Sequence, residues 1–364
     1  AGVCSSDLPA VRRLELSERK LKILAAIVNT YVETGEPVGS KLLALELGVS
    51  SATIRNEMAN LVEMGYLQQP HTSAGRIPSQ KGYRIYIDRL MPEAAITEEE
   101  QKYLDGMLMV NAYDPDKLLS CVSQLLANTS KFAAVSTMPS GSGAVIKGVQ
   151  FVQTSRRTAM AILITSAGVM KTRVFRCDFD ITAEMLRIFF RIFNEKFAGL
   201  PVSAVTPAFI QSVGVSLGEM AVLMSSALLA VLEVARDCMH AEINLKGETN
   251  LLFYPEFQLG NVRRIMDFLE SEQEVSRFLT KGLEQTEHSV PRISKAQVFI
   301  GSETNRPELS DSSLIIAHYS IGGEHAGTIG IIGPTRMHYG KWIAHLEYVS
   351  DSVGKMLTSL MKEQ

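Results

Sequence analysis

Two groups of β-rich runs, separated by a long helical segment, constrain the fold of this chain more than any other feature. The first group, AVIKGVQFVQT, TAMAILIT and VMKTRVFRC, lies within 144–177, and the short polar turns between its runs are typical of an antiparallel meander. The second group, AQVFI, SLIIAHYS and GTIGIIG, lies within 296–333. Neither group has enough strands for a stable sheet of its own. We therefore predict one sheet domain, 97–181 with 289–364, interrupted by a mainly helical insertion, 182–288.

Length and composition indicate a globular protein with several domains. The chain has 364 residues, of which 46% are hydrophobic and 21% are charged. Its four cysteines are far apart and form no C-x-x-C pair, which argues against a disulfide framework and a zinc site. The beginning lacks the apolar region of a signal peptide, and charged Glu219 and Glu233 bracket the most apolar stretch. We expect a cytoplasmic protein without membrane contact.

The N-terminal region, 1–92, has the pattern of a helix-turn-helix. Ser17 is a candidate N-cap for a first helix, a second helix stops at Gly48, and Ser50 caps a third helix that ends near Gly65. After it, Met91–Ile96 has the composition of a linker, because Thr97 and Glu100 then form a capping box that opens a new helix.

The third predicted helix separates an apolar face from a polar face. Ile54, Met58 and Leu61 fall on one stripe and must face the core. On the other side, Asn56 can pair with adenine and Arg55 can reach guanine or phosphate, which suits the major groove of DNA. The free N–H groups at the start of the helix suit a phosphate. The candidate DNA contacts on this helix are Ser50, Ser51, Ala52, Thr53, Arg55, Asn56 and Asn60.

A hairpin follows this helix and resembles a wing. Tyr66–Gln69 and Arg76–Pro78 can pair as short strands around a polar tip in which Gly75 supplies the turn. Such a tip would lie along the DNA backbone or in the minor groove. The candidate DNA contacts on the hairpin and the helix after it are His71, Thr72, Ser73, Arg76, Lys81 and Arg84. A solvated surface is the simpler explanation of each piece, but their order predicts a winged helix-turn-helix.

The charge of this region favours a dimer. The net charge of the chain is −3, whereas residues 1–91 contain eleven Lys and Arg against nine Asp and Glu, a balance of +2. Phosphate contacts dominate affinity for DNA, so a balance of +2 is weak for a single domain. Two such domains in a homodimer would combine their phosphate contacts and so raise the affinity for DNA.

Two long runs show a family resemblance. GEPVGSKLLALELGVSSATIRNEMANLVEMGYLQQPHTSAGRIPSQKGYRIYID closely resembles the HrcA family of heat-inducible transcription repressors. SSLIIAHYSIGGEHAGTIGIIGPTRMHYGKWIAHLEYVSD is similar to the closing segment of that family. The resemblance implies an α+β multidomain fold, with a winged helix, a GAF-like antiparallel sheet domain and a dimerisation domain inserted within it. It also implies a dimeric repressor of chaperone operons that binds an inverted repeat, the CIRCE element. The GroE chaperonin would support its activity, and unfolded proteins that compete for chaperonin would relieve repression.

Other motifs do not predict a catalytic or cofactor site. The run GEPVGSK lacks the spacing of a phosphate loop, and the glycines of GGEHAGTIGIIG fit a tight turn at Gly322 and Gly323 followed by a strand. No metal-ligand spacing accompanies the histidines, and no nucleophile motif is present. We therefore expect no cofactor, no metal and no enzymatic activity. The histidines considered are His318, His325, His338 and His345.

Two further functions stay open at this point. The sheet domain could be a metabolite sensor with DNA binding as its output, since apolar and aromatic runs such as MLRIFFRIF could line a ligand cavity. Core packing or subunit contact is the commoner meaning of such runs. An enzyme fused to a DNA-binding domain is the remaining alternative, and the missing catalytic residues argue against it.

Overall fold

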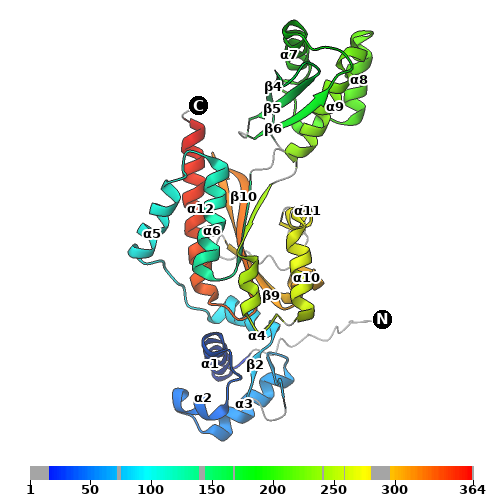
Figure 1. The fold of residues 1–364 in the computed structure, drawn as a ribbon. Helices are drawn as coiled ribbons and strands as arrows, with labels where there is room; N and C mark the ends of the chain where they lie inside the picture. Colours follow the sequence, from blue (N-terminus) through cyan, green and yellow to red (C-terminus); the bar gives the residue numbers. More distant parts are fainter. Residues whose placement is uncertain are drawn as a thin grey trace, which may run out of the picture. The chain divides into compact units, whose positions relative to one another are not determined.

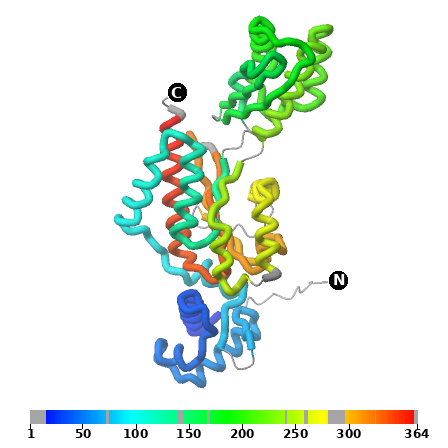
Figure 2. Tube along the Cα trace, viewed as in Figure 1, coloured from blue at the N-terminus to red at the C-terminus, as the bar shows by residue number. Residues whose placement is uncertain are grey.

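The structure is a computed structural model in which two compact units can be distinguished. One unit is Ala1–Ala94 with Thr335–Gly340, and the other is Ala95–Pro334 with Lys341–Gln364. Figure 1 shows the elements and Figure 2 traces the chain as a tube. The residues that the structure describes are 16–71, 75–138, 144–166, 169–239, 242–257, 259–279 and 296–362.

The first unit is a winged helix-turn-helix whose boundaries follow the predicted capping signals. Ser17 accepts a hydrogen bond from the backbone N–H of Lys20 as N-cap, and Gly35 ends the same helix with φ of 71°. Gly48 ends the next helix with φ of 65°. The elements are α1 (Glu18–Thr34), α2 (Ser40–Leu47), α3 (Ser51–Glu63), β1 (Leu67–Gln68), β2 (Ile77–Pro78), α4 (Gln80–Ile85) and the π-helical turn η1 (Tyr86–Leu90).

The segment Thr335–Gly340 completes the core of this unit. The ring of Tyr339 packs on the ring of Tyr83 with centroids 5.9 Å apart, and both side chains are almost fully buried. Met337 is buried as well. The winged helix therefore contains residues that lie far beyond the predicted range of 1–92.

A five-stranded antiparallel sheet is the centre of the second unit. Its strand order is β7-β3-β10-β9-β8. Gly322 and Gly323, both with positive φ, form the tight turn between β9 and β10, as the sequence predicts. The strands are β3 (Ala133–Thr137), β7 (Ile243–Lys246), β8 (Ala296–Ile300), β9 (Ser312–Ile321) and β10 (Glu324–Pro334).

Helices cover both faces of this sheet. Phe268 and Phe278, from the α10–α11 region, pack in one core with Leu314 and its neighbours on the sheet. Ser136 points the other way and donates a hydrogen bond to Leu119 O of α6, because successive side chains of a strand face opposite sides. The helices are α5 (Glu98–Met109), α6 (Pro115–Ser130), α10 (Leu259–Glu270), α11 (Glu272–Arg277) and α12 (Tyr339–Lys362), and the 3₁₀ turns are η3 (Glu248–Phe253), η5 (Gly301–Thr304) and η6 (Pro307–Leu309).

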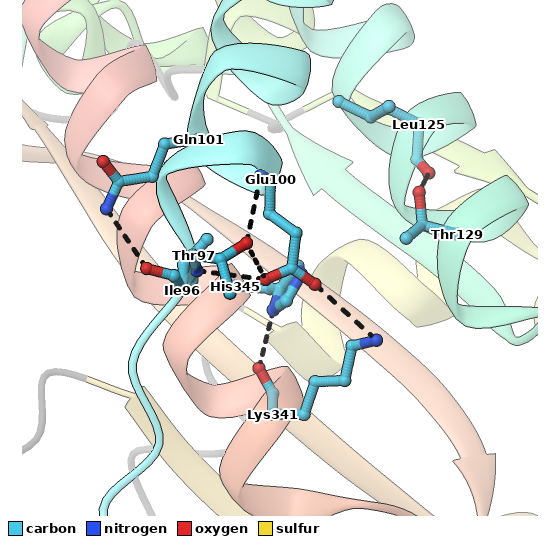
Figure 3. A network of polar contacts seen from close by, with 8 residues as sticks. All are labelled: Ile96, Thr97, Glu100, Gln101, Leu125, Thr129, Lys341 and His345. Carbon is cyan, nitrogen blue, oxygen red and sulfur yellow. Dashed lines mark hydrogen bonds and ion pairs between the residues drawn. The ribbon is translucent and has the colours of Figure 1, made fainter.

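The predicted capping box at the start of α5 is present and connects α5 to α12. Thr97 accepts a hydrogen bond from Glu100 N, and Glu100 accepts one from Thr97 N. The same carboxylate lies 3.8 Å from Lys341 Nζ and 3.6 Å from His345 Nε2, and Figure 3 draws these residues. His345 Nδ1 donates to Lys341 O, so this histidine is a buried packing residue whose Nδ1 has a backbone partner.

The predicted meander forms a sheet of its own and does not join the five-stranded sheet. Its strand order is β4-β5-β6, and it shares a hydrophobic core with three helices. In that core Val149 and Leu163 of the strands meet Phe193 and Val231 of the helices. The elements are β4 (Ile146–Gln153), β5 (Thr158–Thr165), β6 (Met170–Arg176), α7 (Ala183–Phe197), η2 (Val202–Ala204), α8 (Pro207–Leu217) and α9 (Met220–Met239).

The placement of these strands corrects the predicted division of the chain. The sequence predicts a sheet domain of 97–181 with 289–364 and an insertion of 182–288. In the structure, the inserted module between β3 and β7 contains the meander together with α7, α8 and α9, whereas α10 and α11 belong with the five-stranded sheet. The physical reason is that β5 buries alternate residues in a core with α7 and α9. Its apolar face is therefore covered by helices of the same module and needs no contact with the five-stranded sheet.

Candidate nucleic-acid interface

The start of α3 is fixed by hydrogen bonds from hydroxyl groups. Ser50 Oγ accepts from Thr53 N at 3.1 Å and lies 2.8 Å from Thr53 Oγ1. Ser51 Oγ lies 3.1 Å from Ser40 Oγ, which joins the first turns of α3 and α2. Three of the candidate DNA contacts, Ser50, Ser51 and Thr53, therefore also stabilise the helix-turn-helix. Ser50 does so as the N-cap of α3.

The two faces of α3 separate as predicted. Ile54, Met58 and Leu61 are buried in the core. Arg55 and Asn56 are exposed on the polar side. The other exposed candidates there are Ala52 and Asn60, while Thr53 is half-buried.

No competing polar contact occupies the side chains of the exposed face. Across the described ranges, Arg55, Asn56 and Asn60 make no side-chain hydrogen bond or ion pair. A side chain that must pair with a base edge needs this availability, because its donors and acceptors cannot serve two partners well. The geometry is therefore compatible with direct reading of bases.

Two basic residues at the start of α1 pair with Glu57, the acidic residue in the middle of α3. Glu57 lies 3.5 Å from Lys20 Nζ and 3.9 Å from Arg19 Nη1. A free carboxylate so close to the reading face would repel phosphate, and these pairs reduce that repulsion. Arg19 and Lys20 are not among the predicted site residues, although two basic residues directly after Glu18 in the first predicted helix were a usable signal.

The wing is built from β1, β2 and the turn before α2. Leu67 pairs with Pro78 and Gln68 pairs with Ile77. His71 is exposed, whereas Thr72 and Ser73 lie outside the described residues.

Arg76, beside the wing tip, is less available than its position suggests. It is half-buried, its Nη1 donates to Gly75 O at 3.3 Å, and it has further partners. Gly75 has no positive φ, so, contrary to the prediction, it does not supply the turn through a left-handed backbone conformation. Its role is close approach of the backbone to Val38.

Lys81 and Arg84 differ in how far they are engaged. Lys81 is exposed, although its Nζ donates to Met64 O at 3.0 Å and lies 4.3 Å from the ring centroid of Tyr66. Met64 is the C-cap of α3, where a positive charge interacts favourably with the helix dipole. Arg84 is half-buried and pairs with Asp88 at 3.5 Å, so its charge is partly neutralised within the protein.

Metal ligation finds no support in the described portion of the chain. No group of three or more His, Cys, Asp or Glu that could hold a metal ion occurs among the described residues. His318 and His325 contact each other, with His325 Nε2 3.0 Å from His318 Nδ1.

The arrangement of α2, α3 and the wing agrees with what comparison with known proteins shows. The family profile described as winged helix-turn-helix transcription repressor, HrcA DNA-binding, matches residues 15–89. The profile described as HrcA protein C terminal domain matches residues 116–343. The chain belongs to the HrcA family.

Curated HrcA relatives match nearly the whole chain. The heat-inducible transcription repressor HrcA of Acetivibrio thermocellus is 38% identical over 355 residues, which cover 95% of this chain and 97% of that protein. The HrcA of Carboxydothermus hydrogenoformans is 35% identical over 345 residues, covering 94% and 98%. The fold is also similar to a crystal structure of a hypothetical protein solved at 2.2 Å, with a TM-score of 0.59 and 22% identity over 95% of this chain and 100% of that one.

HrcA membership confirms the predicted class of function. The chain is a transcription repressor with a DNA-binding winged helix, and the family is not one of enzymes. The α+β multidomain fold with antiparallel sheets is confirmed as well. Within the described ranges, no helix combines the length and apolar character needed to cross a bilayer.

Proposed function

We propose that α3 reads base edges in the major groove of a specific operator. The observation that carries this proposal is the exposed, unpaired state of Arg55 and Asn56 on the face opposite the buried stripe of α3. Asn56 has the bidentate geometry that recognises adenine, and Arg55 has the fork that recognises guanine or phosphate. Ala52 and Thr53 approach the groove closely, and Asn60 lies one turn further along.

The remaining contacts position the domain on the DNA backbone. Ser50 and Ser51 lie at the N-terminus of α3, where helix N–H groups favour phosphate. Lys81 adds an exposed charge, whereas Arg76 and Arg84 contribute less because they are half-buried and engaged. The wing contacts in this proposal are His71, Thr72, Ser73 and Arg76.

We further propose that the protein acts as a homodimer on an inverted repeat. The weak positive balance of the N-terminal region supports two footprints acting together. The inserted module exposes large apolar side chains on α8 and α9, among them Val215 at 78% and Val222 at 77% exposure, which suit a subunit contact. A twofold axis would then place two α3 helices on two half-sites of one DNA face.

The heat response follows from the family in this proposal. The operator is the CIRCE element of chaperone operons, and the GroE chaperonin supports the active repressor in the cytoplasm. Unfolded proteins titrate chaperonin during heat stress, so the repressor loses support and transcription rises. The relatives bear the name heat-inducible transcription repressor, which supports this regulation.

Selection of bound sites from random DNA duplexes tests target and symmetry together. We expect the selected sites to converge on an inverted repeat, with sedimentation of the purified protein giving a dimer mass. Convergence on a single unrepeated site, or no enrichment over bulk DNA, would contradict the proposal. The same binding assay is repeated with purified GroE, which should raise the fraction of the repressor that can bind DNA.

A further inference from the structure

A groove lined mainly by residues with polar side chains lies between the end of β9 and the C-terminal half of α12. Its volume is about 620 Å³. None of its lining residues belongs to the winged-helix unit. The lining residues are His318, Ser320, Ser350, Asp351, Gly354, Lys355, Thr358 and Ser359.

The groove contains one cation without a protein partner. In the described part of the chain, Lys355 makes no hydrogen bond or ion pair and its side chain is exposed. Asp351, the acidic residue of the lining, already has an interaction within the protein. The lining therefore carries one carboxylate and one ammonium group, and the ammonium group of Lys355 is the one left available to pair with an anion.

Hydroxyl groups around this cation supply further hydrogen-bond donors. Ser320 on β9 and Ser359 on α12 are exposed on the two sides of the groove. Ser350 and Thr358 differ, because their hydroxyls donate to Glu347 O and to Gly354 O. Hydroxyl donors beside an ammonium group are the usual partners of phosphate and carboxylate oxygens.

The walls of the groove are held in place by close backbone packing. A Cβ on Gly354 would lie 2.7 Å from Ser320 O, so only glycine lets α12 approach β9 this closely. Thr358 Oγ1 also accepts a hydrogen bond from Gly322 N at 3.1 Å. The groove is therefore preformed, which lowers the entropic cost of binding a ligand.

A histidine pair borders the same groove and has fixed ring positions. His318 Nδ1 lies 3.0 Å from Thr328 Oγ1 and 3.0 Å from His325 Nε2, and the two rings are 4.8 Å apart. Their resonances can report on a ligand in the groove, because His318 is one of the lining residues.

We propose that this groove binds a small metabolite through a phosphate or carboxylate group. Lys355 provides the counter-charge, and the hydroxyls of Ser320 and Ser359 donate hydrogen bonds to the anion. The site would give the repressor a chemical input beside its response to heat. It does not depend on the choice of operator or on the DNA contacts of α3.

Titration of the full-length protein with two simple anions tests the proposal. Inorganic phosphate and succinate are added separately at constant ionic strength, and the ring resonances of His318 and His325 are followed by NMR. We expect saturable shifts with at least one anion, and the anion that binds identifies the group recognised. Lys355→Gln should weaken that binding by about tenfold, the loss expected for one charge-assisted hydrogen bond.

Two controls separate binding in the groove from other effects of salt. Lys102→Gln removes an exposed lysine of α5 that makes no polar contact in the described structure, and it should leave the affinity unchanged. Arg55→Ala removes a proposed DNA contact and should also leave the affinity unchanged. Circular dichroism confirms that each variant folds. Shifts that do not saturate, or an affinity that Lys355→Gln leaves unaltered, would overturn the proposal.

Discussion

The carbonyl oxygen of Val38 lies 2.4 Å from the position that a Cβ on Gly75 would occupy. Val38 and Arg76 exchange two backbone hydrogen bonds of 2.9 Å, so the turn before α2 forms an isolated β-bridge with the wing. Glycine is required at position 75 by this contact and not by its own backbone conformation. The wing is thereby joined to the helix-turn-helix that it accompanies.

Gly75→Ala should destabilise the winged helix, because the added methyl group cannot fit against the Val38 backbone without displacing it. We expect a loss of about 1–3 kcal/mol in the free energy of unfolding, the usual cost of overpacking. Gly39→Ala is the matched control, since no atom lies within 4 Å of a Cβ there. Urea denaturation of both variants measures the difference, and equal midpoints would refute the packing role of Gly75.

Asn56→Ala should reduce discrimination between the operator and random DNA by about 1–3 kcal/mol, because it removes a bidentate base contact.

Lys81→Ala should weaken binding to both DNAs alike and reduce the salt slope by about one, as expected for a phosphate contact. Gel-shift titrations at several salt concentrations measure both quantities. Equal losses on both DNAs for Asn56→Ala would rule out its role in reading bases.

Glu100→Gln should lower stability at neutral pH and make little difference in acid. The backbone hydrogen bond from Thr97, followed by the Thr97 hydroxyl and the charges of His345 and Lys341, holds the pKa of Glu100 below its ordinary value of 4.5. A folded-state pKa below the unfolded value gives stability that is complete above pH 4.5 and is lost as the pH falls through the folded value.

Urea unfolding from pH 7 down to about pH 3 should therefore show the two midpoints converging. Glu99→Gln is the control for this experiment, since Glu99 is exposed in the same helical turn and makes no polar contact in the described structure. A constant gap between wild type and Glu100→Gln at every pH would contradict the assigned cause.

Cys121 should react with iodoacetamide before Cys177 and Cys238 in the native protein. Burial raises the pKa of the Cys238 thiol to about 11 and also raises the pKa of Cys177, so little thiolate is present at about pH 8. Cys121 is only partly buried. Mass spectrometry after brief alkylation of a Cys4→Ser variant measures the order. Reaction at Cys238 as fast as at Cys121 would show that this core opens readily.

Local signals in the sequence predicted the winged helix well. Ser50 and Gly48 mark the boundaries of α3 and α2 because capping depends on the few residues at each helix end. The buried stripe that includes Ile54 fixed which face of α3 is exposed, so Asn56 could be located before any coordinates.

Long-range assignments could not be predicted in the same way. The apolar run of β5 indicates a buried strand, but it does not reveal whether the strand joins the sheet of β10 or packs against α9 in a separate sheet. Nor does any local pattern indicate that Tyr339 completes the core around Tyr83, because that contact joins distant parts of the chain. The half-burial of Arg76 could not be predicted either, because no local pattern indicates how far the rest of the unit covers that side chain.

The inserted module leaves and rejoins the five-stranded sheet at adjacent points. Thr137, the last residue of β3, pairs with Ile243, the first residue of β7, and Met138 N donates to Glu242 O at 2.7 Å. The two neighbouring strands hold each other in register whatever the chain does between them. The module is thus an insertion between two paired strands. Substitutions or deletions on its surface should therefore leave the pairing of the five-stranded sheet unchanged.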